Sequence, residues 1–195
     1  MKHQITIRQY RAMDLLMLTA LACIGEVLIT LGATIWFPGE PYVLSVVPAI
    51  VAIVMVRWGC FAAVPALIGE IVFCLVSRAS LPQFIIYCVG SLLPLVLTQV
   101  LCRIGWKRLH ENVLFTLVYG LATALLMQLG RGLMALVMGN SVAVCLQFVT
   151  TDALTTVFTA LVVWITSRLD GVLEDQRHYL RRVAEEAEQE RQATY

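Results

Sequence analysis

The chain has 195 residues, of which 59% are hydrophobic and 14% are charged, and its formal net charge is +1. A soluble domain carries about 25% charged residues, so this deficit indicates a protein with several membrane-spanning helices. The near-neutral charge provides no global field that would attract nucleic acid, and we expect no such partner. The six cysteines form no CxxC pair and show no metal-ligand spacing, so we expect buried, reduced thiols and no metal site.

Six apolar segments, separated by short polar or helix-breaking stretches, predict an all-α membrane protein with six transmembrane helices. A polar, basic segment at 1–13 comes first, the six-helix domain covers 14–169, and a charged tail covers 170–195. The expected helices are about 14–37, 42–58, 60–76, 81–102, 112–138 and 142–167. The second helix is short and the turn after it, Arg57-Trp58-Gly59, is tight.

Positive charge is sorted by loop, and this predicts the orientation of the chain. With six helices, both termini and the second and fourth loops share one side. That side carries the basic residues Lys2, Arg8, Arg11, Arg57, Arg103, Lys107, Arg108 and Arg168. The other side carries only Arg78, so both termini are expected in the cytoplasm. The tail is expected to form a solvated helix, or alternatively a contact for a cytoplasmic partner.

Arg131 lies inside the fifth apolar segment, where an arginine costs roughly 2.5 to 3.5 kcal/mol. It should therefore face protein or a water-filled cavity and have a partner. Chain direction and a rise of ~1.5 Å per residue place Glu70, Arg131 and Asp152 at similar depths in the outer half. Glu26 lies nearer the middle of the membrane. Two interpretations stay open: a binding cavity, or an Arg131–Asp152 ion pair that only fixes helix packing.

Polar residues recur at helical spacing on the last three apolar segments, and such faces turn inward in lipid. They predict a polar cavity that opens outward. The residues expected to bind a substrate there are Glu70, Gln83, Tyr87, Gln128, Arg131, Asp152 and Thr155. Arg131 can offer a fork of donors to a carboxylate or phosphate. Asp152 and Glu70 could hold Arg131 when the site is empty, or bind an amine on the ligand.

No catalytic or ATP-binding motif is evident in the chain. The three histidines, His3, His110 and His178, all fall in polar segments outside the predicted helices. We therefore expect no enzyme activity and no cofactor, with any ATP-driven work done by another chain. A membrane enzyme of an unrecognised class stays a minor alternative. A second alternative is a membrane sensor that signals through helix 142–167 into the tail.

Three short runs carry a resemblance to a known family. They are Arg57-Trp58-Gly59-Cys60-Phe61-Ala62-Ala63 continuing to Gly69-Glu70, then Gln128-Leu129-Gly130-Arg131, and Thr150-Thr151-Asp152. Together with the size and the expected topology, these runs resemble the substrate-binding S component of energy-coupling factor (ECF) vitamin transporters. The resemblance covers about residues 10–170.

The resemblance implies a six-helix bundle in a prokaryotic cell membrane, with an outward-facing pocket for a small vitamin-like or precursor nutrient. An anionic or zwitterionic group of that nutrient would lie near Arg131. The implied partners are one membrane coupling subunit and two ATPase subunits. The family docks on the coupling subunit through an alanine-xxx-alanine motif in the first helix. The corresponding small residues here are Ala22 and Gly25, beside Glu26, which could instead join the cavity.

Overall fold

The computed structural model describes residues 6–36, 44–104, 112–169, 171–176 and 179–182, together with 109, 185 and 189. All of the regular structure in these residues is helical. The elements are α1 (Ile7–Trp36), α2 (Val47–Trp58), η1 (Gly59–Ala62), α3 (Ala63–Val76), α4 (Leu81–Gly90), η2 (Leu93–Leu95), α5 (Val96–Ile104), α7 (Val113–Val137), α8 (Val142–Thr151) and α9 (Ala153–Ser167). The basic residues Lys2, Lys107 and Arg108, the loop at 37–43 and much of the tail lie outside the described residues.

Several helical stretches are long and apolar enough to cross a membrane. By length and composition these are Ile7–Trp36, Val47–Val76, Leu81–Arg103 and Val113–Val137. The pair α8 and α9, bent by 43° at its break, would be a fifth. The prediction of an all-helical protein with several apolar helices, compatible with a multi-pass membrane protein, is therefore confirmed.

The stretch Val47–Val76 is not one straight rod, although it qualifies by length. A Cβ atom built at Gly69 would lie 2.6 Å from Cγ2 of Val47, so α2 and α3 lie side by side. Two residues so far apart in sequence would be about 33 Å apart along a continuous helix. The chain reverses at Gly59, whose φ of +63° is a left-handed conformation that glycine adopts at little cost. This reversal falls at the turn predicted from Arg57-Trp58-Gly59.

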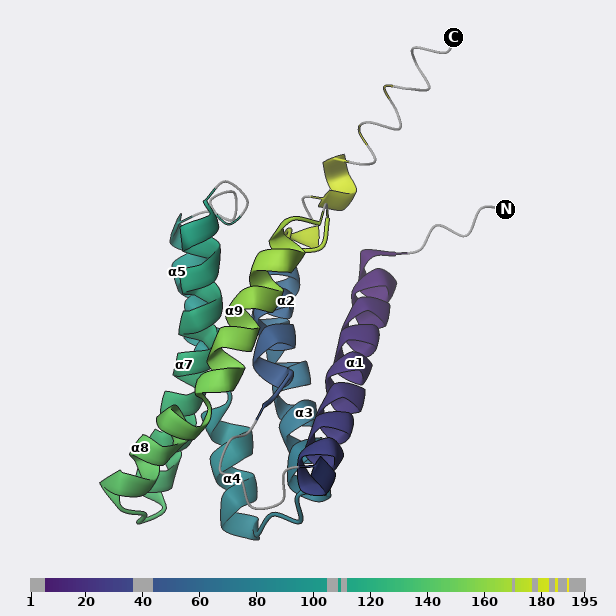
Figure 1. Ribbon diagram of the computed structural model, residues 1–195. Coiled ribbons are helices and arrows are strands. Elements are labelled where there is room, and N and C mark those ends of the chain that lie inside the picture. The colour runs from purple at the N-terminus through teal and green to yellow at the C-terminus, as the bar shows by residue number, and fades with distance from the viewer. Residues whose placement is uncertain are drawn as a thin grey trace.

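Helices α1 and α2 run antiparallel and are joined by polar contacts at both ends of α2. Nε and Nη2 of Arg57 each donate to the carboxylate of Asp14 at 2.8 Å, and Nε1 of Trp58 donates to the same carboxylate at 2.6 Å. At the other end, the Ser45 hydroxyl donates to Glu26 at 3.0 Å. Figure 1 shows the start of α1 and the ends of α5 and α9 at one end of the bundle, with α4 and α8 towards the other.

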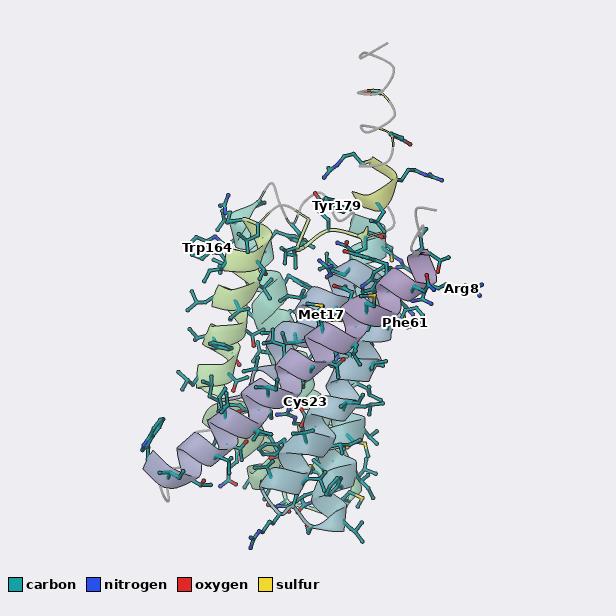
Figure 2. All side chains as sticks on the ribbon, turned by 90° about the vertical axis from the view of Figure 1, so that its right-hand side faces the viewer. Arg8, Met17, Cys23, Phe61, Trp164 and Tyr179 are labelled. Atoms are coloured by element: carbon teal, nitrogen blue, oxygen red, sulfur yellow. The ribbon has the colours of Figure 1, made fainter. Side chains whose placement is uncertain are left out.

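The core is centred on α2, in which every residue is buried. A helix that is apolar on all sides must be covered by protein or by lipid, and α2 is covered by protein, since it contacts α1, α3, α5, α7 and α9. In contrast, α1 lies obliquely across one face of the bundle (Figure 2). Its outer side chains are exposed, as for Met17 at 70%. Lipid tails would cover such a face in a membrane.

Glycines allow helix backbones to approach closely around α7. A Cβ atom at Gly90 of α4 would lie 2.5 Å from the backbone nitrogen of Arg131. A Cβ atom at Gly120 of α7 would lie 2.7 Å from Cα of Ala160 in α9. Small residues at helix crossings are the usual way to achieve such packing in membranes. These crossings hold α4 and α9 against α7, the helix that carries Arg131.

Gly120→Ala is expected to lower the free energy of unfolding by about 1–3 kcal/mol, because the added methyl group would meet backbone atoms that cannot rotate away. Gly32→Ala is the matched control, since its Cβ would meet only the Trp36 ring at 3.5 Å. That control should leave stability unchanged or raise it slightly, because alanine favours a helix more than glycine. Thermal unfolding in detergent measures both, and equal melting temperatures for the two variants would contradict the packing described.

Candidate functional site

The site is built around Arg131 on the buried face of α7. This helix begins where the Asn112 side chain accepts a hydrogen bond from the backbone N–H of Leu114 at 3.0 Å. Its buried face includes Ala124, Gln128 and Arg131, which recur at helical spacing. Arg131 is only 4% exposed. The guanidinium therefore depends on protein partners rather than water.

The Arg131 guanidinium is hydrogen-bonded through all three of its nitrogen atoms. Nη1 donates to the Asp152 carboxylate at 3.1 Å, and Nη2 donates to Glu70. Nε donates to the Ser91 hydroxyl at 3.1 Å, and the guanidinium carbon lies 5.0 Å from the centre of the Tyr87 ring. These partners come from α3, from α4 and its end, and from the break between α8 and α9. One side chain therefore ties together four parts of the bundle.

A small cavity adjoins this ion-pair cluster. Its walls combine carboxylates, hydroxyls, one guanidinium and three aromatic rings. The lining residues are Glu26, Ser45, Glu70, Phe73, Tyr87, Arg131, Phe148, Thr151 and Asp152. The volume of the cavity is about 30 Å³. This is space for roughly two water molecules, at about 10–15 Å³ for each.

The structure places Glu26 in the cavity wall. Its Oε2 accepts hydrogen bonds from the Ser45 hydroxyl at 3.0 Å and from the Val46 N–H at 3.2 Å. Ala22 is fully buried, and a Cβ atom at Gly25 would lie 3.2 Å from Val46. This face of α1 packs against the bundle within the chain, and the prediction that Ala22, Gly25 and Glu26 dock on a coupling subunit stays a prediction.

Two predicted lining residues, Gln128 and Thr155, support Asp152 instead of lining the cavity. Nε2 of Gln128 donates to the Asp152 carbonyl at 3.0 Å and to the Thr156 hydroxyl at 2.9 Å. The Thr155 hydroxyl donates to Oδ1 of Asp152 at 3.2 Å and accepts from the Ser45 N–H at 3.0 Å. They hold Asp152 where the helix is broken, so their effect on a ligand would be indirect.

Gln83 lies away from the cavity, contrary to its predicted role. Its side chain is exposed in the first turn of α4, and its Oε1 accepts hydrogen bonds from the Ser80 N–H at 2.7 Å and the Ser80 hydroxyl at 3.0 Å. This is half of a capping box, which stabilises the start of the helix. Gln83 lies about one helical turn before Tyr87, and only Tyr87 lines the cavity.

The rest of the lining was not among the residues expected to bind a substrate; it consists of Ser45, Phe73, Phe148 and Thr151. The Phe73 and Tyr87 rings lie 5.0 Å apart, and the Tyr87 and Phe148 rings 5.9 Å apart. A search for polar residues at helical spacing does not find apolar rings. Their distance in sequence from the carboxylates could have found them, since Phe73 follows Glu70 by three residues and Phe148 precedes Asp152 by four. Each pair therefore lies on one helix face.

No family model, curated protein or solved structure matches this chain. The class is defined by the fold and the site alone. The protein is an all-helical one whose apolar helices are compatible with several membrane crossings, built around a small polar cavity with a buried arginine, three carboxylates and an aromatic wall.

Arg131→Met is expected to lower the free energy of unfolding by about 3–5 kcal/mol, because it leaves two buried carboxylates without their cation. Adding Glu70→Gln and Asp152→Asn to the same chain should recover most of that loss, since the uncompensated charges are then gone. Thermal or denaturant unfolding in detergent compares the single and triple variants. A single variant as stable as the wild type, or a triple variant no better than the single one, would contradict this role of the ion pairs.

Proposed function

We propose that this chain is the substrate-binding component of a membrane transporter, of the S-component type found in energy-coupling factor systems. It would capture a small vitamin-like or precursor nutrient from outside the cell. A membrane coupling subunit and two ATPase subunits would supply the ATP-driven step, and this chain itself would be no enzyme. The observation that carries the proposal is the cavity around Arg131, where polar and aromatic groups from distant helices converge.

Two helix breaks beside Arg131 support a binding role over a purely structural one. The chain passes from α-helix into a short 3-10 turn between α4 and η2, where the Ser91 hydroxyl accepts a hydrogen bond from Nε of Arg131. It breaks again at Asp152, between α8 and α9, where Nη1 is bound. Substrate sites of membrane transporters are typically formed by such discontinuous helices, because the freed backbone groups and side chains line the cavity.

The path of the chain supports six membrane crossings with both termini in the cytoplasm, which is part of the proposal. Arg57 lies at the same end of the bundle as Asp14 in the early part of α1, and Arg78 lies in the opposite turn between α3 and α4. The basic end would face the cytoplasm by the positive-inside rule. The cavity residue Glu70 would then lie in the outer half.

The site differs from the predicted one in how Arg131 would meet a ligand. Its nitrogen atoms already donate to Asp152, Glu70 and Ser91, so an anionic group would have to share the guanidinium with two carboxylates. The cavity is also smaller than the roughly 300–1,000 Å³ usual for ligand sites. Binding of a whole nutrient would therefore separate the lining helices, with the break at Asp152 as the natural hinge.

The alternative function is a sensor that signals through α9 into the tail. One contact favours it: Nη1 of Arg57 donates to the carbonyls of Gly171 at 3.0 Å and Val172 at 2.9 Å, which ties the segment after α9 to the bundle. Deleting residues 177–195 separates the two functions. Nutrient uptake that survives this deletion would count against signalling as the main role.

Phe148→Ala should weaken binding of the co-purified nutrient about tenfold, because it removes part of the aromatic wall. Leu146→Ala is the matched control, on the same helix but 61% exposed, and should leave affinity unchanged. The nutrient is first identified by mass spectrometry of the purified protein, and affinity is then measured by calorimetry. If no nutrient co-purifies and none from a vitamin panel binds, the proposed function is wrong.

A further inference from the structure

Glu26 is a buried carboxylate with an incomplete set of partners. It is 2% exposed, and both of its hydrogen bonds reach the same oxygen, Oε2. Within the described part of the chain, Oε1 accepts no hydrogen bond, and Arg131 forms ion pairs with Glu70 and Asp152 but not with Glu26. A buried ionised carboxylate without a cation is costly. Since Glu26 lines the cavity, a ligand can supply the cation.

The formal charges in the cavity also favour a cationic ligand. Three carboxylates, from Glu26, Glu70 and Asp152, face one guanidinium, from Arg131. The two ion pairs of Arg131 account for one positive charge between two carboxylates. With all groups ionised, the cavity carries an excess of negative charge. It would therefore attract a cation and repel an anion.

The aromatic walls and the small volume of the cavity favour a primary ammonium group. The rings of Phe73, Tyr87 and Phe148 border it, and aromatic faces attract ammonium groups. Room for about two waters also suits a primary ammonium group, which is similar in size to a water molecule. The carboxylates do not converge into a group that could hold a metal ion among the described residues.

We propose that the ligand of this cavity carries a primary ammonium group, which forms an ion pair with Glu26 and lies against the aromatic wall. This assignment rests on the proposed function. It changes the expected substrate from an anionic or zwitterionic nutrient to one that carries a cationic amine. The Ser45 hydroxyl and the Val46 N–H bind Oε2 of Glu26, which leaves Oε1 for the ligand. An additional anionic group on the ligand would have to compete for Arg131.

Methylammonium chloride is the simplest probe of this assignment. The full-length protein is purified in lipid nanodiscs, and its melting temperature is followed while methylammonium replaces potassium at constant ionic strength. We expect a saturable rise in melting temperature. The affinity should be only of millimolar order, because so small a ligand offers few contacts. Tetramethylammonium, which is wider and has no N–H donor, and sodium acetate should give no rise.

Glu26→Gln should weaken methylammonium binding at least tenfold, and Glu26→Asp should retain part of it because the charge is kept. Glu185→Gln is the matched control, since it makes the same exchange at an exposed residue of the tail, and should bind like the wild type. If Glu26→Gln does not fold, the wild-type comparison of methylammonium with acetate and tetramethylammonium decides the matter. No response of the wild type to methylammonium, or unchanged affinity in a folded Glu26→Gln variant, would overturn the proposal.

The two proposals fail in different ways. A neutral or anionic nutrient that binds equally well to the wild type and to Glu26→Gln would overturn the ammonium assignment and leave the transport function standing. Methylammonium binding that depends on Glu26 supports the assignment even when uptake is absent. In that case, the absence of uptake counts against the transport function alone.

Discussion

The structure depends on the need to satisfy one guanidinium buried among apolar helices. Arg131 can remain charged there only if its N–H groups have close acceptors, and these come from Glu70, Ser91 and Asp152. To reach it, α4 must pack against α7 at a glycine contact, and the α8–α9 helix must break at Asp152. The positions of three neighbouring segments therefore follow from the partners of one side chain.

The same constraint accounts for the cavity. Side chains that serve as acceptors cannot also fill space as leucine or phenylalanine would, and the broken helices leave room between α4 and α8. On one side lie the longer helices α1, α3 and α7, which contribute Glu26, Glu70 and Arg131 to the lining. On the other side lie short helices joined by breaks. A cavity with one firm wall and one wall of short helices suits a site that must open for a ligand and close again.

The sequence alone predicted the ion-pair cluster because depth can be counted from chain direction, and Glu70, Arg131 and Asp152 fall at similar depths. Other parts of the site needed the structure. Helical spacing gives the face of a residue but not its neighbours, so it predicts Gln83 in the cavity although this side chain caps α4. The depth of Glu26 depends on the oblique path of α1, which no local pattern encodes. The rings of Phe73 and Phe148 looked like ordinary core.

We propose that the cavity around Arg131 is a cation-selective site open to the outside rather than a sealed ion-pair cluster. Thr151→Cys, in a chain whose six natural cysteines are replaced by alanine, places a thiol in the cavity lining. Its rate of modification by external cationic aminoethyl methanethiosulfonate is compared with that of the anionic sulfonatoethyl reagent. We predict faster modification by the cationic reagent, slowed by methylammonium. No modification by either reagent, while a cysteine at the exposed neighbour Thr150 reacts, would contradict the claim.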